Sequence, residues 1–326
     1  MSEQGIQDKR TKEGKEPLVI LTGPTAVGKT GLSIGLARRI GGEIISADSM
    51  QVYRGMDIGT AKIRPEEMEG IRHYLVDILD PGEAFNVVLF QQMAREAMEE
   101  IRSRGKIPIL VGGTGFYIQA LLYDIDFSDH GDKEDYRKEL ARLAEEKGSE
   151  YLHTRLAQVD PEYASSVHHH NVKRVIRALE YYHETGQKLS DHNRQQQEKI
   201  SPYNFAYFVL NHDRQILYDR IDRRVDQMME EGLPEEVRRL ADQGCTPEMI
   251  SMQGLGYKEF FAWFDGEATL EEVTERIKLE TRRFAKRQLT WFRREKEVIW
   301  INKGDYASEE EILEDMTGRL REKGII

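Results

Sequence analysis

A phosphate-binding signature lies near the start of the chain. The segment GPTAVGKT satisfies the pattern G-x-x-x-x-G-K-[ST] in full, with an apolar run before it and a helical pattern after it. In such a loop the glycines let backbone N–H groups turn toward phosphate oxygens, and the N-terminus of the following helix adds partial positive charge. Lys29 then neutralises the terminal phosphate, and the Thr30 hydroxyl is placed to ligate a magnesium ion that bridges phosphate oxygens. The predicted diphosphate site comprises Gly23, Pro24, Thr25, Ala26, Val27, Gly28, Lys29 and Thr30.

The phosphate loop by itself predicts a bound diphosphate and leaves the reaction open. Nucleotide kinases use such a loop to transfer a phosphoryl group, and NTPases use it to hydrolyse one. An alkyl transferase can use it to hold a diphosphate leaving group. The other polar segments must distinguish these reactions.

An acid, a hydroxyl and an amide follow the second predicted strand. Asp48, Ser49 and Gln51 come shortly after residues 43–46. Because the carboxyl ends of parallel strands meet at one edge of a sheet, we expect these side chains to face the same crevice as the phosphate loop. Asp48 can activate a nucleophile there, or it can cap the next element or reach the magnesium through water. The spacing leaves both interpretations open.

Two later segments are candidates for ligand contact. LVGGTGFY places three glycines at the end of a predicted strand, which suggests close approach to a ligand, and Thr114 is positioned to donate to it. The turn 253–258 precedes a basic helix whose arginines share one face. Such a face either meets phosphate or is merely solvated. Its arginines are Arg276, Arg283, Arg287 and Arg294, and the apolar positions of another face are Val273, Ile277, Phe284 and Trp291.

Hydrophobic patterning predicts the elements that hold these residues. Short apolar or β-branched runs alternate with longer helical patterns, which is typical of βαβ units and a parallel sheet. From about Tyr123 to Pro202 the strand-like runs disappear and charged helical sequence takes over. The predicted fold class is therefore α/β, with a P-loop NTPase-like parallel sheet core and an inserted all-helical domain. We expect a disordered tail at 1–16, the core at 17–122 and 203–326, the insertion at 123–202, and strands at 18–22, 43–46, 73–78, 107–112, 205–210 and 298–302.

Composition excludes several classes of protein. A net charge of -11 argues against indiscriminate binding to polyanions, because Lys and Arg supply the affinity for phosphates. The single cysteine, Cys245, excludes an internal disulfide and a cysteine-rich zinc module, and it favours a reducing compartment. No apolar run reaches the roughly 20 residues needed to cross a bilayer, and the N-terminal stretch has no signal-peptide core. We expect a cytoplasmic protein that does not enter a membrane.

Six segments carry a specific resemblance across almost the whole chain. GPTAVGKT, DSMQVYRGMDIGTAK, LVGGTGFY, KRVIRALE, GLGYKE and TRRFAKRQLTWFR, in this order, closely resemble the bacterial tRNA dimethylallyltransferases, also called isopentenyl-tRNA transferases. The resemblance implies a P-loop core with an inserted helical domain. It also implies transfer of a dimethylallyl group from dimethylallyl diphosphate to the exocyclic amine of the adenosine 3′ to the anticodon, with magnesium and with release of diphosphate. The anticodon stem-loop of tRNA is then the macromolecular partner, and no obligate protein partner is expected.

The resemblance also implies roles for individual residues. Asp48 matches the general base, Thr30 the magnesium and diphosphate contact, and Arg220 the diphosphate-binding arginine. The arginine assignment has two alternatives, Arg223 and Arg224. The implied contacts to tRNA are Asp48, Ser49, Met50, Gln51, Thr114, Lys173, Arg174, Arg177, Gln253, Gly254, Leu255, Gly256, Tyr257, Lys258, Arg283 and Arg287.

Two segments depart from the family pattern. Residues 63–65 follow GTAK with Ile-Arg-Pro where the family usually has proline directly, in what we expect to be a connecting loop. The family's HPND appears here as HHHN at 168–171, which puts in doubt the contacts at the edge of the insertion. Three adjacent histidines suggest a metal site. Adjacent side chains do not easily converge on one ion, however, so we expect a surface loop.

Three alternative functions remain open at this point. A small-molecule or nucleotide kinase shares the fold and the loop, and it would bind ATP tightly. A non-catalytic tRNA-binding P-loop protein would bind RNA and release no diphosphate. An isopentenyltransferase for free adenine nucleotides would use the same chemistry, but the long insertion and the basic helix favour a macromolecular acceptor.

Overall fold

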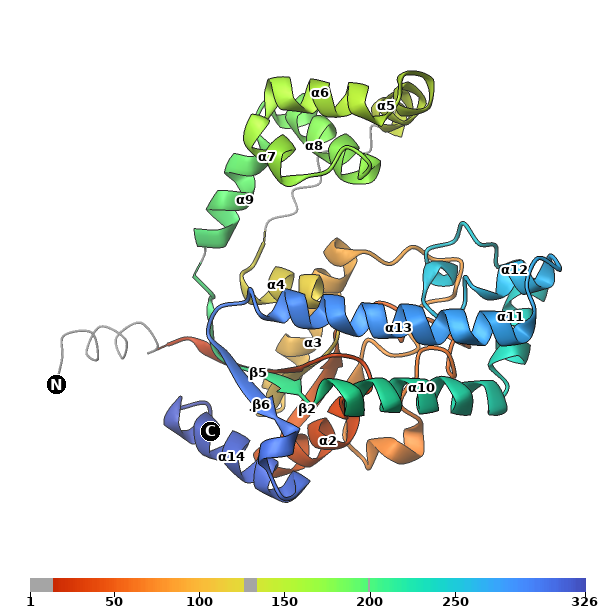
Figure 1. Cartoon of the computed structure of the whole chain (residues 1–326). Helices are drawn as coiled ribbons and strands as arrows, with labels where there is room; N and C mark the ends of the chain where they lie inside the picture. Colours follow the sequence, from red (N-terminus) through yellow and green to blue (C-terminus); the bar gives the residue numbers. More distant parts are fainter. Residues whose placement is uncertain (1–13, 126–133, 199) are drawn as a thin grey trace. The chain divides into compact units, whose positions relative to one another are not determined.

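The chain divides into two compact units, each with a hydrophobic core of its own. Met1–Leu122 together with Pro202–Ile326 forms unit 1, and Tyr123–Ser201 forms unit 2 (Figure 1). Residues 1–13 of the predicted tail lie outside the described residues, and the first strand begins at Glu16. The structure, a computed structural model, describes residues 14–125, 134–198 and 200–326.

Unit 1 is built on a six-stranded sheet in which every pair of neighbours is parallel. The strands are β1 (Glu16–Thr22), β2 (Gly42–Ser46), β3 (His73–Tyr74), β4 (Ile107–Gly112), β5 (Tyr203–Asn211) and β6 (Val298–Asn302). Their order is β3-β2-β4-β1-β5-β6, and Val19 of β1 lies opposite Ile109 of β4 and Ala206 of β5. β1, β2, β4 and β5 are near-continuous buried apolar runs, as expected where helices cover both faces of a parallel sheet. The predicted α/β class is confirmed.

The third strand is shorter than the pattern predicts. Residues 73–78 were expected to be extended, but β3 ends at Tyr74. Leu75 and Asp77 adopt φ angles of 61° and 55°, in the left-handed region that a strand cannot accommodate. The Asp77 carboxylate instead pairs with the buried ammonium of Lys62. The apolar run therefore belongs to a turn that is held by an ion pair.

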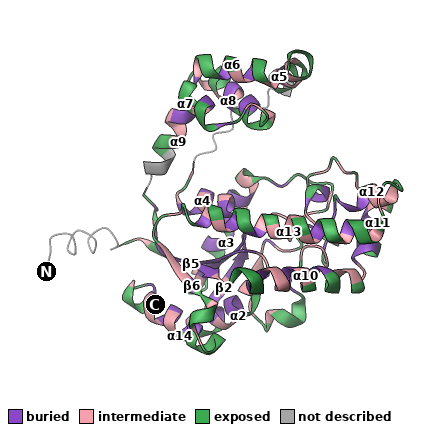
Figure 2. Cartoon of the chain, viewed as in Figure 1, coloured by how far each residue is buried: buried purple, intermediate pink, exposed green. Residues whose placement is uncertain are grey.

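Helices flank the sheet of unit 1. They are α2 (Lys29–Ile40), α3 (Val87–Ser103), α4 (Gly115–Leu122), α10 (Arg214–Glu230), α11 (Leu233–Asp242), α12 (Phe260–Phe264), α13 (Leu270–Phe292) and α14 (Glu309–Glu322), with short 3-10 turns η1 (Pro65–Met68), η2 (Ser251–Gln253) and η3 (Lys303–Asp305). α2 and α14 pack together, and their buried side chains join Val19 and Leu21 of β1 in one core. α3 packs against β2, β4 and α4, and it buries Phe90, Ala94 and Met98. Figure 2 shows the buried sheet between these helices.

The long helix α13 runs beside α10 (Figure 1). Its apolar face buries Val273, as the three-and-four spacing predicts. Two of its cations turn toward α10: Lys278 pairs with Asp226 at 2.7 Å, and Arg282 pairs with Asp222. These two charges are neutralised within the protein, so they are not part of the open basic surface.

Unit 2 is helical throughout its described secondary structure. Its helices are α5 (Glu134–Lys147), α6 (Ser149–Val159), α7 (Pro161–Ser166), α8 (Val172–Thr185) and α9 (Leu189–Glu198). Leu152, Leu156 and Val175 are fully buried in its core. Buried Asp160 accepts hydrogen bonds from the backbone N–H groups of Tyr163 and Ser190, and this ties the start of α7 to α9. No described helix of either unit is long and apolar enough to cross a bilayer.

Candidate functional site

The phosphate loop joins the central strand to α2, and its glycines are required by close contacts. A Cβ atom on Gly23 would lie 2.6 Å from the Leu210 carbonyl oxygen. Gly28 has a φ angle of 94° and immediately precedes α2. Within the loop, the N–H of Val27 donates to the Pro24 carbonyl at 3.4 Å. The first amides of α2 have no intrahelical acceptor, so they point toward the space where an anion can bind.

Lys29 links this loop to the other charged groups of the site. Its Nζ donates to the carbonyl oxygens of Gly23 and Pro24 at 3.0 and 2.9 Å. Burial lowers its pKa from 10.5 to about 8; the Arg224 charge lowers it further, whereas the Asp48 carboxylate raises it. Such effects act over short distances in a partly buried site. Lys29, Arg224 and Asp48 therefore share one electrostatic environment.

The two oxygens of Asp48 have different surroundings. Oδ1 accepts hydrogen bonds from the backbone N–H groups of Met50 at 2.9 Å and Gln51 at 3.3 Å. Among the described residues, Oδ2 has no hydrogen-bond donor. The structural interpretation accounts for Oδ1, and the role of Asp48 as a base stays a prediction. Oδ1 holds the turn, and Oδ2 is available to accept a proton.

Thr114 is brought next to the aspartate by a backbone contact. Its N–H donates to the carbonyl of Ala47, the residue before Asp48, at 3.2 Å. A Cβ on Gly112 would collide with the Ala47 backbone, so only glycine permits this approach. Thr114 is partly exposed, directly before α4. The loops that follow β2 and β4 therefore meet, as strand ends in a parallel sheet should.

The glycines after β4 approach protein atoms, which corrects the expectation that they approach a ligand. The space that a Cβ on Gly113 would need is occupied by the Gln288 amide, and that of Gly115 by the Trp291 ring. Both neighbours belong to α13, which is remote in sequence. Glycines at the end of a strand allow close approach of either a ligand or another part of the protein, and the sequence alone does not say which.

Gln288 is a site residue that the sequence did not reveal. Its side chain is 6% exposed; Oε1 accepts from the Thr25 N–H at 2.9 Å, and Nε2 donates to the Gly113 carbonyl at 2.9 Å. It thus joins the phosphate loop to the loop after β4. This bond also occupies the Thr25 amide, which corrects the expectation that this amide faces phosphate. A polar residue on the apolar face of the predicted helix was the signal that could have found it.

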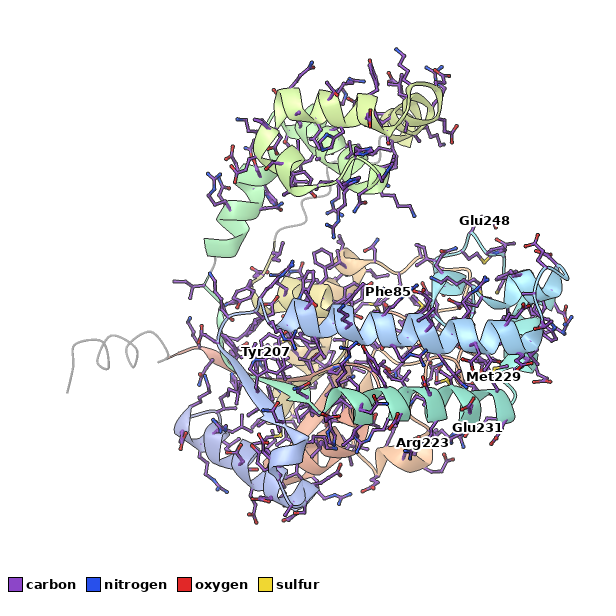
Figure 3. All side chains as sticks on the ribbon, in the orientation of Figure 1. Phe85, Tyr207, Arg223, Met229, Glu231 and Glu248 are labelled. Atoms are coloured by element: carbon purple, nitrogen blue, oxygen red, sulfur yellow. The ribbon has the colours of Figure 1, made fainter. Side chains whose placement is uncertain are left out.

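The three candidate arginines of α10 have different environments. Arg223 is exposed on the outer side of the helix (Figure 3). Arg224 is buried enough for desolvation to lower its pKa, and its charge acts on Lys29. Arg220 lies one turn earlier, on the same face, and its charge helps to lower the pKa of His212. The geometry therefore brings Arg220 and Arg224 to the strand ends and leaves Arg223 in solvent.

Lys303 is a second residue that sequence reasoning missed. It follows β6, and its Nζ lies 2.9 Å from the position of a Cβ on Gly28 of the phosphate loop. The side chain is 10% exposed and pairs with Glu309 at 2.8 Å. Burial lowers the pKa of His212, and the charges of Arg220 and Lys303 lower it further. A lysine at the carboxyl end of a predicted parallel strand was the signal that could have found it.

The turn 253–258 lies against the loop that carries Asp48. A Cβ on Gly254 would lie 3.0 Å from the Met50 sulfur. Gln253 and Lys258 are exposed, and Leu255 is partly exposed. These positions leave Gln253, Leu255 and Lys258 as candidates for contact with a large ligand, whereas Gly254 and Gly256 are buried.

Tyr257 lies in the core, which corrects the expectation that its side chain contacts tRNA. It is 0% exposed, and its hydroxyl donates to Glu236 Oε1 at 2.7 Å. Burial, followed by the charge of Glu236, raises the pKa of Tyr257 well above its usual value. The same carboxylate accepts the backbone N–H groups of residues 57–59. Tyr257 and Glu236 therefore fix residues 57–62, the DIGTAK loop, in place.

Ser49, Met50 and Gln51 are all partly exposed, but Gln51 is already engaged. Its Nε2 donates to the carbonyls of Thr60 at 3.3 Å and Ala61 at 3.4 Å, and its Oε1 accepts from Ser46 at 3.3 Å. The amide holds the Asp48 loop and the DIGTAK loop together. If Gln51 contacts a base of tRNA, its side-chain amide must exchange these hydrogen bonds for bonds to the base.

Cations that are predicted to contact tRNA are exposed on α13 of unit 1 and on α8 of unit 2. On α13, Arg283 pairs with Glu280 at 2.6 Å, and the Arg287 guanidinium lies 5.8 Å from the centre of the Phe284 ring. On α8 of unit 2 the predicted tRNA contacts are exposed. These α8 residues are Lys173, Arg174 and Arg177.

Comparison with known proteins identifies relatives along nearly the full length. The family model described as IPP transferase matches residues 51–295. The chain is 60% identical over 311 residues to the tRNA dimethylallyltransferase of Lachnoclostridium phytofermentans, with coverage of 95% of this chain and 99% of that protein. It is 51% identical over 310 residues to the tRNA dimethylallyltransferase of Geobacillus thermodenitrificans, with coverage of 94% and 98%.

Solved structures share the fold. The full-length tRNA isopentenylpyrophosphate transferase from Bacillus halodurans is 47% identical, with a TM-score of 0.72 and coverage of 95% of this chain and 98% of that one. A eukaryotic dimethylallyltransferase acting on tRNA is 31% identical, with a TM-score of 0.76 and coverage of 88% and 74%. These likenesses confirm the resemblance found in the six sequence segments.

Proposed function

The chain belongs to the IPP transferase family and prenylates tRNA, and on that premise we propose that it transfers a dimethylallyl group from dimethylallyl diphosphate to the exocyclic amine of the adenosine 3′ to the anticodon. The observation that carries this proposal is the position of Lys29, whose Nζ donates to the phosphate-loop carbonyls of Gly23 and Pro24 and whose charge interacts with those of Arg224 and Asp48. One site therefore offers cations for a leaving diphosphate and a carboxylate for removal of a proton.

The cations and the loop amides form the diphosphate side of the site. Lys29, Arg224 and Arg220 supply positive charge from α2 and α10, and Lys303 supplies it from the end of β6. In a partly buried site, such preorganised charges stabilise the negative charge that builds on the leaving group. Lys29 now donates to two loop carbonyls, so binding of the donor would require it to exchange these bonds for phosphate oxygens.

Thr30 fits the role of magnesium ligand. It is exposed in the first turn of α2, and within the described residues its hydroxyl makes no hydrogen bond. A hydroxyl oxygen next to the phosphate loop suits a hard cation that prefers oxygen. When bound, magnesium would neutralise charge on the phosphate oxygens.

Asp48 forms the acceptor side of the site. The adenine amine is a poor nucleophile because its lone pair is delocalised into the ring, so its proton must be removed as attack proceeds. Oδ2 of Asp48 accepts that proton while the new N–C bond forms at the allylic carbon. The C–O bond to the diphosphate breaks, and its electron pair leaves with the diphosphate oxygen.

The adenosine that accepts the dimethylallyl group is stacked in the anticodon loop, and it cannot reach this site while it is stacked. We propose that the adenosine is turned out of the anticodon loop, at a cost of a few kcal/mol that contacts with the loop offset. Ser49, Met50 and Thr114 border Asp48 and are the nearest candidates for contact with the base. The exposed cations of α13 and α8 neutralise tRNA phosphates. The proposed setting of the reaction is the cytoplasm.

A direct assay tests the proposal. Unmodified tRNA and labelled dimethylallyl diphosphate should give labelled tRNA and free diphosphate with the wild-type chain. In Asp48→Asn, which keeps the shape of the side chain, turnover should fall by roughly 10²- to 10⁴-fold while tRNA affinity changes little. Transfer of phosphate from ATP, without labelled tRNA, would instead identify the chain as a kinase. Wild-type turnover in Asp48→Asn would remove Asp48 from the role of base.

A further inference from the structure

Three adjacent histidines of unit 2 converge at one end of a surface turn. His168, His169 and His170 precede α8, and the turn is closed by the N–H of Asn171, which donates to the His168 carbonyl at 2.8 Å. In a strand, neighbouring side chains would point to opposite faces. In this turn the ring centroids of the three histidines lie between 4.0 and 5.0 Å apart. The expected surface loop is present, and in it the three rings lie closer together than their adjacency in sequence suggests.

The spacing of the ring nitrogens suits a single metal ion. One ligand nitrogen from each ring lies within 4.8 Å of the other two. Two metal–nitrogen bonds of about 2.1 Å at a tetrahedral angle place their nitrogens about 3.4 Å apart, so the rings must rotate toward one another to close the set around an ion. His168 and His170 are exposed, so this rotation displaces no core side chain, although it exchanges the hydrogen bond from the His170 N–H to His168 Nδ1.

Two residues in the first turn of α6 lie beside His169. Ser149 Oγ lies 3.3 Å from His169 Nδ1, and Glu150 Oε1 lies 4.0 Å from His169 Nε2. When Nδ1 donates its proton to the serine oxygen, Nε2 keeps a lone pair for a metal ion. The Glu150 carboxylate is exposed and lies beside that nitrogen, outside the set of three mutually close histidines, so it would have to rotate toward the other rings to supply an oxygen ligand. Both residues come from an element that already packs against α8.

We propose that His168, His169 and His170, with Glu150, bind one divalent transition-metal ion of the zinc class. Three imidazoles and a carboxylate form a donor set typical of Zn²⁺, whereas Mg²⁺ prefers oxygen ligands and discriminates against such a site. The ion links the start of α6 to the turn before α8 and stabilises unit 2. This site is separate from Thr30 and does not depend on the proposed transferase function.

Calorimetric titration of the full-length chain with Zn²⁺, in the presence of excess Mg²⁺, tests the proposal. The wild type should bind one Zn²⁺ per chain. The double variant His168→Gln/His170→Gln changes only exposed side chains and should bind at least about tenfold more weakly. His183→Gln, an exposed histidine of α8 outside the cluster, is the matched control and should bind as the wild type does.

Two further readouts separate metal binding from a folding defect. Without zinc, the double variant and the wild type should melt at the same temperature, and added zinc should raise the melting temperature of the wild type alone. Co²⁺ in place of Zn²⁺ should give visible absorption bands in the wild type that the double variant lacks. Equal zinc affinity in the wild type and the double variant, or no binding by the wild type, would overturn the proposal.

Discussion

The side chain of Gln288 accepts a hydrogen bond from the backbone N–H of Thr25 at 2.9 Å, although the two residues are 263 positions apart in the chain. This bond connects the basic helix α13 directly to the phosphate loop. The second half of the same amide holds Gly113, in the loop that carries Thr114. The phosphate loop, the loop after β4 and the proposed tRNA-binding helix α13 are therefore joined by one buried side chain.

The first prediction concerns this amide. Gln288→Leu keeps the approximate size of the side chain but leaves the Thr25 N–H and the Gly113 carbonyl without partners, at a cost of about 1 to 3 kcal/mol for each unsatisfied group. The free energy of unfolding should fall, and KM for the allylic diphosphate should rise more than KM for tRNA. Denaturant unfolding and steady-state kinetics measure both effects. A loss of stability with an unchanged donor KM would show that Gln288 serves the fold alone.

The second prediction is a pH dependence. The pKa of Lys29 is lowered to about 8, so its ammonium is charged below that pH and neutral above it. Affinity for the anionic donor should therefore fall as the pH rises through about 8. The profile of kcat/KM for the donor, at saturating tRNA, records this midpoint.

A variant tests whether Lys29 is the group whose titration gives this pH profile. The Arg224 charge is one cause of the lowered pKa, so Arg224→Met should move the midpoint to higher pH, in addition to any loss of affinity. A midpoint that stays in place in Arg224→Met would assign the titration to another group.

The third prediction tests Lys303. Its ammonium lies beside the phosphate loop, and a hydrogen bond to a charged group contributes about 1.5 to 3 kcal/mol. Lys303→Met should therefore weaken donor and diphosphate binding by roughly ten- to a hundredfold, with little change in tRNA affinity. Glu309→Gln is the matched control: it removes the partner of Lys303 but leaves the ammonium, so donor binding should be kept or strengthened. Equal loss in both variants would mean that the ion pair only supports the loop.

The fourth prediction concerns the basic surface of α13. Arg283→Glu/Arg287→Glu should weaken tRNA binding and flatten its dependence on salt, by roughly 0.7 to 0.9 units of the logarithmic slope for each phosphate that the variant no longer neutralises. Arg321→Glu, an exposed arginine of α14, is the control for a general change of net charge. Binding isotherms at several salt concentrations give the slopes. If the double variant keeps the wild-type slope, these arginines are only solvated.

Local patterns in the sequence were sufficient for the parts of the protein that depend on neighbouring residues. The phosphate loop, the alternation of strands and helices and the six family segments are all local, and they predicted the α/β fold and the family correctly. The strands 107–112 and 298–302 were predicted with the bounds that the structure has. β3 was overestimated, because an apolar run does not reveal that Leu75 and Asp77 adopt left-handed conformations.

Tertiary structure decided which residues meet at the site. Strand order places the end of β6 beside β5 and near the phosphate loop, which selects Lys303, and helix packing selects Gln288. Helix phase turns Arg224 inward and leaves Arg223 in solvent, although the two are adjacent in sequence. Burial likewise places Tyr257 in the core. Sequence distance carries no information about these contacts, because they are set by packing among elements that are far apart along the chain.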